Sequence, residues 1–216
     1  MNPPPNDRAK PSRPWRPTLI GAAVAALAGV LYARTLAPTV LLYGEADTLD
    51  SAMLQAGVSV LGIGHPTGYP TYMMLTHLFT YLPVGDTAYR VNLASAVYGV
   101  AAVFVVYLVG LRASRRAVAA ATGALAFGLS GVFWSQAVIA EVYTLEALLV
   151  ALVLLVLLVW RDRRDDRYLP LAALLVGLSL THHLTSVLLV PAALAFVLMT
   201  DRGVFRRTGL LLKALG

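Results

Sequence analysis

Acidic side chains gather in the stretch from residue 44 to residue 92, which lies between two strongly apolar segments. Its first acids are Glu45, Asp47 and Asp50. Carboxylates in such a place can act as a general base or orient an acceptor hydroxyl, with a pKa tuned by partial burial. A solvated acidic loop that follows the preference of helix N-termini for acids explains the same spacing. The spacing alone leaves both interpretations open.

The six residues His65 to Pro70 read HPTGYP and predict a rigid turn. Two prolines fix the backbone, and Gly68 permits a tight turn between them. His65 would then be held where it can donate a hydrogen bond or move a proton. Tyr69 is either part of the same site or an interfacial aromatic side chain. The turn is therefore a site element or a structural turn at the membrane surface.

Arg90, followed by Asn92, stands near the start of the next apolar segment. An unpaired guanidinium is costly at such a position. Arg90 should therefore pair with an acid such as Glu141, or bind an anion such as a lipid phosphate, which suits its forked donors. Snorkelling to the lipid headgroups is the structural alternative.

Trp134, Glu141 and Tyr143 fall between two further apolar segments. Glu141 could be a second acid or the partner of Arg90. Trp134 and Tyr143 could stack on a sugar or anchor the chain at the interface. Glu146 lies about one helical turn inside the following segment, so it should face the bundle rather than lipid.

His182 and His183 are adjacent and about 100° apart on a helix, so only one can point into a shared cavity. A metal site that joins His65 to one of them is an alternative, but no His-x3-His spacing supports it. We therefore assign no metal ligands, and a divalent metal stays an open alternative that no spacing supports. The chain has no cysteine, so disulfides cannot hold its loops.

The composition is that of an integral membrane protein. The chain has 216 residues, 58% of them hydrophobic, and a mean hydropathy of +0.73. The apolar share of a soluble domain is about 45 to 50%. The net charge of +6 could suggest a nucleic-acid partner, but the Lys and Arg residues form short runs between apolar segments. We interpret these runs as topology signals and predict no nucleic-acid binding.

Six apolar segments approach the roughly 20 residues that a membrane-crossing helix needs. These segments predict an all-α, polytopic membrane helix bundle with about six transmembrane helices. They are 18–36, 88–110, 116–135, 142–160, 168–183 and 184–200. The first could instead be a signal peptide, but no small-x-small cleavage site follows it. Residues 1–17 are basic and proline-rich, which predicts a disordered tail.

The external loop, residues 37–87, should carry two short helical segments. Residues 47–58 predict an amphipathic helix with Leu49, Met53, Leu54 and Val58 on one side. Residues 69–82 are apolar, aromatic and bounded by prolines, which is typical of a re-entrant or interfacial helix. Residues 201–216 are a cytoplasmic segment or the start of a further span.

The positions of the basic residues predict the orientation of the chain. Basic clusters precede the first span, separate the second from the third and the fourth from the fifth, and follow the sixth. The positive-inside rule places these connections and the N-terminus in the cytoplasm. The acids of the first loop, the histidines and Arg90 are then extracytoplasmic.

Five strings occur in collinear order between residues 31 and 200. They are LAPTV at 36–40, LGIGHPTGYP at 61–70, YRVNL at 89–93, FW at 133–134 with EVY at 141–143, and GLSLTHH at 177–183. In these strings the chain resembles the membrane proteins related to protein O-mannosyltransferases, a family formerly catalogued as a domain of unknown function. That family looks like a branch of the GT-C integral-membrane glycosyltransferases.

The resemblance implies a GT-C-like module that binds a sugar donor linked to a polyprenyl phosphate. It implies a catalytic acid in the first external loop. Glu45 stands where relatives usually carry aspartate and Thr48 replaces the glutamate that follows, so Asp47 shares the candidacy. The expected reaction is inverting transfer to an acceptor hydroxyl of a protein or glycan, with protein O-mannosylation as one option, at a bacterial inner or plasma membrane.

We predict three groups of site residues. The catalytic candidates are Glu45, Asp47 and His65. The donor phosphate would be bound by Arg90, His182 and His183. The substrate pocket would contain Asp50, Tyr69, Asn92, Trp134, Glu141 and Tyr143.

Relatives in this family run well beyond 216 residues, so we expect the chain to be an N-terminal module or a truncated product. The alternative function is a non-catalytic membrane subunit or scaffold, with other membrane subunits as partners. A transporter is less consistent with the sequence, since intramembrane charge is sparse and no inverted repeat is seen.

Overall fold

The computed structural model describes residues 15–41, 46–64, 66 and 68–204, which form helices and loops without a strand. The α-helices are α1 (Trp15–Thr35), α2 (Ala46–Ser59), α3 (Pro70–His77), α4 (Thr87–Ser114), α5 (Ala117–Gly128), α6 (Gly131–Ala137), α7 (Tyr143–Arg163), α8 (Tyr168–Leu180) and α9 (Leu189–Thr200). Two short 3₁₀ helices are η1 (Leu78–Tyr81) and η2 (Leu184–Leu188). The predicted all-α membrane bundle is confirmed.

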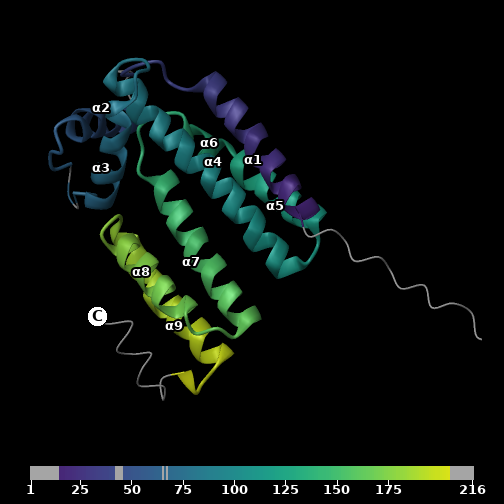
Figure 1. The fold of residues 1–216 in the computed structure, drawn as a ribbon. Helices are drawn as coiled ribbons and strands as arrows, with labels where there is room; N and C mark the ends of the chain where they lie inside the picture. Colours follow the sequence, from purple (N-terminus) through teal and green to yellow (C-terminus); the bar gives the residue numbers. More distant parts are fainter. Residues whose placement is uncertain (1–14, 42–45, 65, 67, 205–216) are drawn as a thin grey trace, which may run out of the picture.

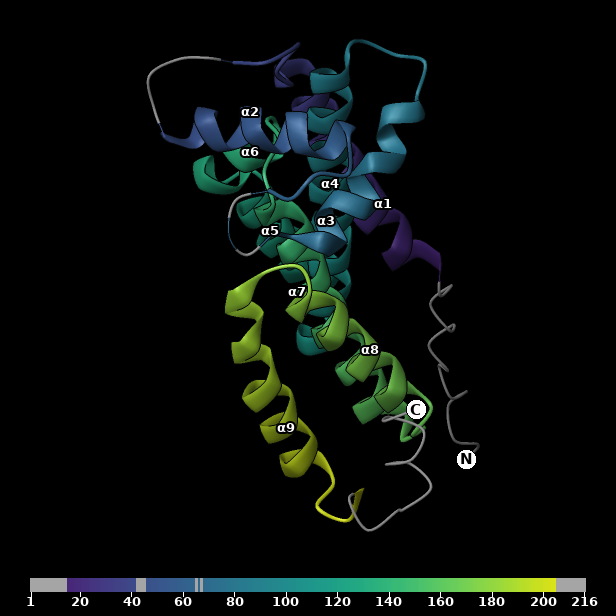
Figure 2. The ribbon, with the colours of Figure 1, turned by 90° about the vertical axis from the view of Figure 1, so that its left-hand side faces the viewer.

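Helix α4 is the centre of the bundle (Figure 1). It packs against α1 and α5 on one side and against α7 on the other, and α8 packs against α7. Helix α2 runs crosswise to α4 at one end of the bundle (Figure 2). The external-loop helices and the bundle therefore meet at that end.

Three helices are long and apolar enough to cross a membrane, by length and composition. These are Pro17–Thr35 within α1, and the whole of α4 and α7. The described part of the chain offers a fourth span if the bent pair of α5 and α6 is counted as one. Two shorter apolar helices, Tyr168–Leu180 and Leu184–Thr200, follow. The chain is an integral membrane protein, and the number of six spans stays a prediction.

The apolar segment predicted at 116–135 is two helices, α5 and α6, which meet at an angle of 65°. Ser130 causes the break locally, because its side chain accepts a hydrogen bond from the backbone N–H of Phe133 (3.3 Å) and so caps a new helix. Gly131, with a low helix propensity, follows it. Hydropathy alone does not detect such a break, since both helices are apolar.

Aromatic side chains hold α1 against the bent pair of α5 and α6. The hydroxyl of Tyr32 donates to the carbonyl oxygen of Gly128 (2.6 Å), and Trp134 Nε1 donates to Thr35 Oγ1 (2.9 Å). The rings of Tyr32 and Trp134 form an edge contact with their centroids 6.0 Å apart. Trp134 thus holds α6 against the C-terminal end of α1.

Helix α2 buries only part of its predicted apolar side. Leu54 and Val58 are buried against α3 and α4, whereas Leu49 is 66% exposed and Met53 is 42% exposed. The sequence predicted the four residues on one side of the helix, and the structure buries two of them, Leu54 and Val58. Because successive residues are 100° apart, Leu49 and Met53 form a neighbouring stripe that turns out of the contact.

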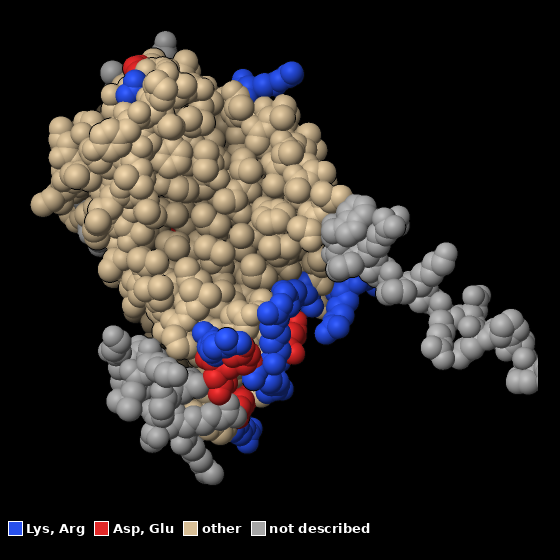
Figure 3. All heavy atoms as spheres, in the orientation of Figure 1, with Lys and Arg blue, Asp and Glu red and all other residues tan. Residues whose placement is uncertain are grey.

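Charged side chains lie at the two ends of the molecule, and the band between them is largely uncharged (Figure 3). The end that carries the α7–α8 connection holds the ion pairs Arg112–Asp162, Arg161–Asp162 and Arg167–Asp165. This distribution suits a bilayer around the middle of the bundle. Which end faces the cytoplasm stays a prediction.

Candidate active site

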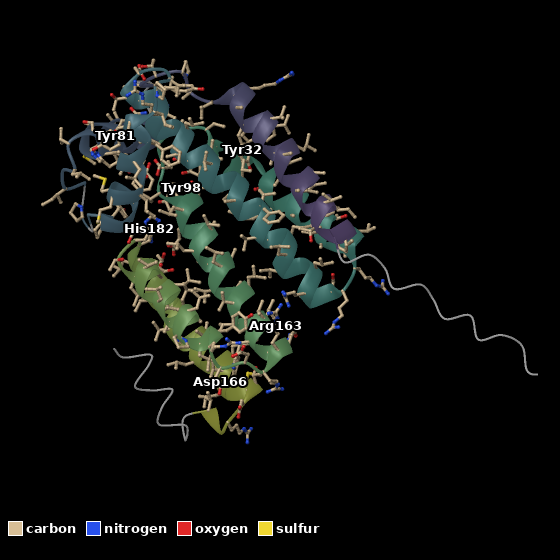
Figure 4. All side chains as sticks on the ribbon, in the orientation of Figure 1. Tyr32, Tyr81, Tyr98, Arg163, Asp166 and His182 are labelled. Carbon is tan, nitrogen blue, oxygen red and sulfur yellow. The ribbon has the colours of Figure 1, made fainter. Side chains whose placement is uncertain are left out.

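A pocket lies where α2, the turn before α3 and the start of α7 meet. It is a small pocket with a volume of about 20 Å³ and is partly open to solvent. Its lining consists of Asp50, Met53, Leu54, Tyr69, Glu141, Val142 and Tyr143. Four predicted substrate-pocket residues line it, namely Asp50, Tyr69, Glu141 and Tyr143. The structure therefore gathers carboxylates and tyrosines at one end of the bundle. In Figure 4, His182 lies between Tyr81 and Tyr98 on one side and Arg163 and Asp166 on the other, about midway along the molecule.

Glu141 belongs to a turn that α4 holds in place. The side chain is 5% exposed, and one carboxylate oxygen accepts a hydrogen bond from the N–H of Val142 (3.3 Å). Ser95 Oγ accepts from the N–H of Glu141 (3.1 Å) and donates to its carbonyl oxygen (3.2 Å). Ser51 Oγ of α2 donates to the carbonyl oxygen of Ala140 (2.9 Å). These contacts fix the backbone that carries Glu141 relative to α2 and α4.

Tyr69 is held in a strained conformation at the start of α3. Its φ is 45°, in the left-handed region, directly after Gly68 with a φ of 89° and before Pro70 at the first helical position. A non-glycine residue pays roughly 1 kcal/mol for this conformation. Such strain often accompanies functional sites.

The phenol of Tyr69 stays protonated in the pocket. Burial raises the pKa of Tyr69, and the nearby Tyr143, Asp50 and Glu141 raise it further. The ring also stacks on His183, with the centroids 5.8 Å apart and the planes at 23°. A protonated phenol beside two carboxylates is a hydrogen-bond donor for a sugar or phosphate oxygen.

His182 is buried behind the pocket rather than in its lining. The side chain is 1% exposed, and Nε2 donates to the carbonyl oxygen of Val142 (3.0 Å). Its ring stacks on Tyr72, with the centroids 6.2 Å apart, and lies 6.4 Å from the ring of Tyr69. Burial lowers the pKa of His182 to about 4, so the imidazole is neutral at pH 7.

We expect this neutral histidine to make the fold sensitive to acid. The folded-state pKa of about 4 lies below the ordinary value of about 6.5, so the unfolded chain binds the proton more tightly. The free energy of unfolding should fall by up to roughly 3 kcal/mol as the pH decreases from about 6.5 to about 4. Thermal unfolding in detergent across this range measures the effect. His182→Gln should flatten this pH dependence, and an unchanged dependence in the variant would contradict the assignment.

Arg90 closes the turn between η1 and α4. Its guanidinium donates to the carbonyl oxygens of Val84 (Nε, 2.8 Å), Thr80 (Nη1, 2.7 Å) and Gly85 (Nη2, 3.0 Å). The predicted pairing with Glu141 is thus replaced by three backbone carbonyls. Binding of a phosphate by Arg90 stays a prediction, and it would require release of some of these carbonyls.

Replacing Arg90 should loosen this turn. A hydrogen bond to a charged donor contributes about 1.5 to 3 kcal/mol, and Arg90→Met removes three such bonds from the turn of residues 80–85. We expect backbone amides there to exchange at least about tenfold faster, measured by hydrogen exchange and mass spectrometry. Arg34→Met, in the last turn of α1, is the control. Unchanged exchange in the Arg90 variant would show that the carbonyl contacts are not what orders the turn.

Asn92 is fully buried and joins three segments. Its Oδ1 accepts from Gln55 Nε2 (2.7 Å), and its Nδ2 donates to the carbonyl oxygens of Ala37 (3.0 Å) and Thr39 (3.4 Å). Neither Asn92 nor Trp134 belongs to the described lining of the pocket. Contact of these two residues with a substrate stays a prediction, and the structure gives both a supporting position.

The predicted catalytic residues fall largely outside the described residues. This applies to Glu45, to His65 and to the side chain of Asp47, whose backbone lies in the first turn of α2. Their roles stay predictions. Among the residues that the structure describes, no group of three or more His, Cys, Asp or Glu side chains could hold a metal ion.

Sequence reasoning missed the supporting residues Ser51, Ser95 and Ser186. Ser95 was detectable, because a polar residue inside an apolar span usually faces other helices. Ser186 of η2 donates to a carboxylate oxygen of Glu146 (2.6 Å). Glu146 therefore faces the bundle, as predicted. Ser51 carried no signal, since a serine in a short surface helix is common.

The fold and the pocket together define a polytopic membrane protein with a carboxylate and tyrosine site at one end of its bundle. Residues 50–204 match the family model of the protein O-mannosyl-transferase TMEM260 N-terminal domain. The chain belongs to this family, which confirms the resemblance inferred from its motifs. It is therefore a glycosyltransferase-related membrane protein.

A curated mouse relative agrees with this assignment. The protein O-mannosyl-transferase TMEM260 of Mus musculus is 30% identical over 190 residues, which cover 86% of this chain and 26% of the relative. The chain thus spans about a quarter of the length of this relative. No solved structure matches the chain.

Proposed function

We propose that this chain is the membrane module of an integral-membrane glycosyltransferase. It transfers a sugar from a polyprenyl-phosphate-linked donor to an acceptor hydroxyl at the extracytoplasmic face. The observation that carries the proposal is the pocket in which Asp50 and Glu141 meet Tyr69 and Tyr143, in a chain of an O-mannosyl-transferase family. The family name points to mannose as the sugar.

The transfer reaction needs one general base and hydrogen-bond donors at the leaving phosphate. The acceptor oxygen forms a bond to the anomeric carbon, the bond from that carbon to the phosphate oxygen breaks, and the phosphate leaves with the electron pair. The acceptor proton passes to a carboxylate. Asp50 is our first candidate for this base, because it lines the pocket and is only partly buried. Glu45 and Asp47 remain the alternatives.

Tyr69, Tyr143 and His183 are suited to bind the lipid-linked sugar donor. Tyrosine rings offer flat apolar faces to a sugar, and a protonated Tyr69 can donate to a phosphate or sugar oxygen. His183 lies against both pocket tyrosines, with its ring centroid 5.8 Å from those of Tyr69 and Tyr143. We therefore propose Tyr69 and His183 as phosphate contacts. Arg90 would join them only after leaving the 80–85 turn.

The test uses membranes that contain the full chain, polyprenyl-phosphate mannose with a labelled sugar, and serine- and threonine-rich peptide acceptors. We expect label to enter the acceptor with time. The chain carrying both Asp50→Asn and Glu141→Gln, inserted at the same level, should transfer none. Equal transfer by this double variant would refute the site. Absence of transfer by the native chain with every lipid-linked sugar tried would refute the activity.

A further inference from the structure

The wall of the pocket is braced from behind by the turn between α8 and η2. His182 Nε2 donates to the carbonyl oxygen of Val142, which also accepts the N–H of Glu146 (3.2 Å) in the first turn of α7. Val142 stands between Glu141 and Tyr143, and all three line the pocket. One imidazole thus supports the residue that separates two of the proposed functional side chains.

The same turn is fastened to α3. The N–H of Thr71 donates to the carbonyl oxygen of Thr181 (3.4 Å), and the hydroxyls of the two threonines are 2.7 Å apart. The ring of His182 lies against Tyr72 and Tyr69. His182 therefore contacts two walls of the pocket, Tyr69 in the turn before α3 and Val142 at the start of α7.

The contact to Val142 fixes the protonation of the ring. A carbonyl oxygen can only accept, so Nε2 carries the proton. Nδ1 is buried and has no hydrogen-bond partner among the residues that the structure describes. A second proton there would place a charge in a buried site, which is strongly disfavoured. Among the described residues, the titratable groups around the ring are Tyr69 just before α3, Tyr72 of α3, His183 of its own turn, and Glu141 beside Val142.

We propose that His182 is a positioning residue for the transfer: a neutral imidazole that holds Val142 and Tyr69 and thereby fixes Glu141 and Tyr143 at the reacting atoms. The catalytic consequence rests on the function proposed above. The bracing itself does not, because it concerns the resting structure. Small displacements of positioned groups lower rates by about 100-fold, so the brace should affect turnover more than binding.

The first test needs no activity. The chain has four histidines, so ¹⁵N-histidine NMR of the purified protein gives few signals. Loss of one signal in His182→Gln assigns it. We expect the assigned ring to show the neutral Nε2–H tautomer and to keep it at pH 5. A ring that titrates near pH 6.5, or that carries its proton on Nδ1, would overturn the proposal.

The second test compares two substitutions. His182→Gln keeps an N–H donor at a similar reach, whereas His182→Phe keeps a stacking ring and loses the donor. Hydrogen exchange of the peptide that spans residues 141–146 should be at least about tenfold faster in His182→Phe and nearly unchanged in His182→Gln. Equal exchange in both variants would overturn the brace, whether or not the chain transfers sugar.

Measurement of kcat and KM distinguishes a positioning role of His182 from a role in substrate binding. In His182→Phe, kcat should fall by about 100-fold with little change in KM, and His182→Gln should recover most of the loss. His77→Phe is the matched control, because His77 Nδ1 lies 2.7 Å from another backbone carbonyl, that of Val58, and does not line the pocket. Full activity of His182→Phe, or an equal loss in the His77 variant, would overturn the positioning role. An inactive native chain with the expected NMR and exchange results would instead refute the proposed function.

Discussion

Asp50→Asn is expected to lower kcat for sugar transfer by at least about 100-fold, with little change in KM. General-base catalysis contributes about 10² to 10⁴, and an amide cannot take the proton of the acceptor hydroxyl. The substitution keeps the size of the side chain, so the pocket should keep its shape. The measurement is the initial rate of label transfer against donor concentration, with the amount of inserted protein determined for each variant.

The controls identify which acid is the base. Asp86→Asn is the matched control, because Asp86 accepts from the N–H of Tyr89 as the N-cap of α4, and asparagine caps a helix equally well. It should transfer at the native rate. Glu45→Gln and Asp47→Asn are measured in parallel. Should either of these lose transfer while Asp50→Asn remains active, the base is that residue and Asp50 only lines the pocket.

Asn92→Leu is expected to produce the largest loss of stability. The substitution removes the partner of Gln55 and of two backbone carbonyls, and it leaves the amide of Gln55 and the carbonyl oxygen of Ala37 buried without that partner. An unsatisfied buried polar group costs about 1 to 3 kcal/mol, so the free energy of unfolding should fall by about 2 to 5 kcal/mol. Denaturant titration in mixed micelles measures the change.

A second substitution on the same helix provides the control for Asn92. Val97 is 45% exposed on α4, where the bundle faces its surroundings, so Val97→Leu should change stability by less than about 0.5 kcal/mol. If both variants unfold at the same denaturant concentration, the Asn92 hydrogen bonds do not hold α2 and the end of α1 to α4. Transfer activity should also fall in Asn92→Leu, since α2 carries Asp50.

The helices could be predicted from the sequence because their signal is long and redundant. The apolar runs at 88–110 and 142–160 correspond to α4 (Thr87–Ser114) and α7 (Tyr143–Arg163), which extend a few residues further at their arginine-bearing ends. An apolar run in the sequence ends at the first charged residues, whereas the helix continues as long as its backbone hydrogen bonds continue. The bend at Ser130 escaped the same method because it changes direction without changing polarity.

The candidate site was predictable only in part. The motifs indicated Asp50, Tyr69, Glu141 and Tyr143, and these residues share one pocket because α2 crosses the end of the bundle. The partners of Arg90 were not predictable. An arginine near a membrane surface satisfies its donors with whichever acceptors are nearest, and backbone carbonyls, such as those of the 80–85 turn, give no signal in a sequence.

His182 shows the same limit. Adjacent histidines predict that one faces a cavity, but the burial of His182 and its bond to Val142 depend on how α8, α3 and α7 pack. Packing of this kind is set by contacts between segments distant in the sequence. The residue type was therefore predictable as a site component, whereas its position behind the pocket was not.

The account depends most on the two ends of the bundle lying on opposite sides of the membrane, with the pocket outside. The chain has no cysteine, so single cysteines can be added to the native protein. Ser59 at the end of α2 and Ser114 at the end of α4 form a matched pair, because both are exposed and each hydroxyl donates to a carbonyl oxygen of its own helix at 2.7 Å.

Labelling of these two cysteines in intact cells with a membrane-impermeant maleimide is the most direct test. We predict that Ser59→Cys is labelled before the membrane is opened, and that Ser114→Cys is labelled only afterwards. The reverse pattern, or labelling of both from the same side, would contradict an extracytoplasmic pocket and with it the proposed transfer from a lipid-linked sugar.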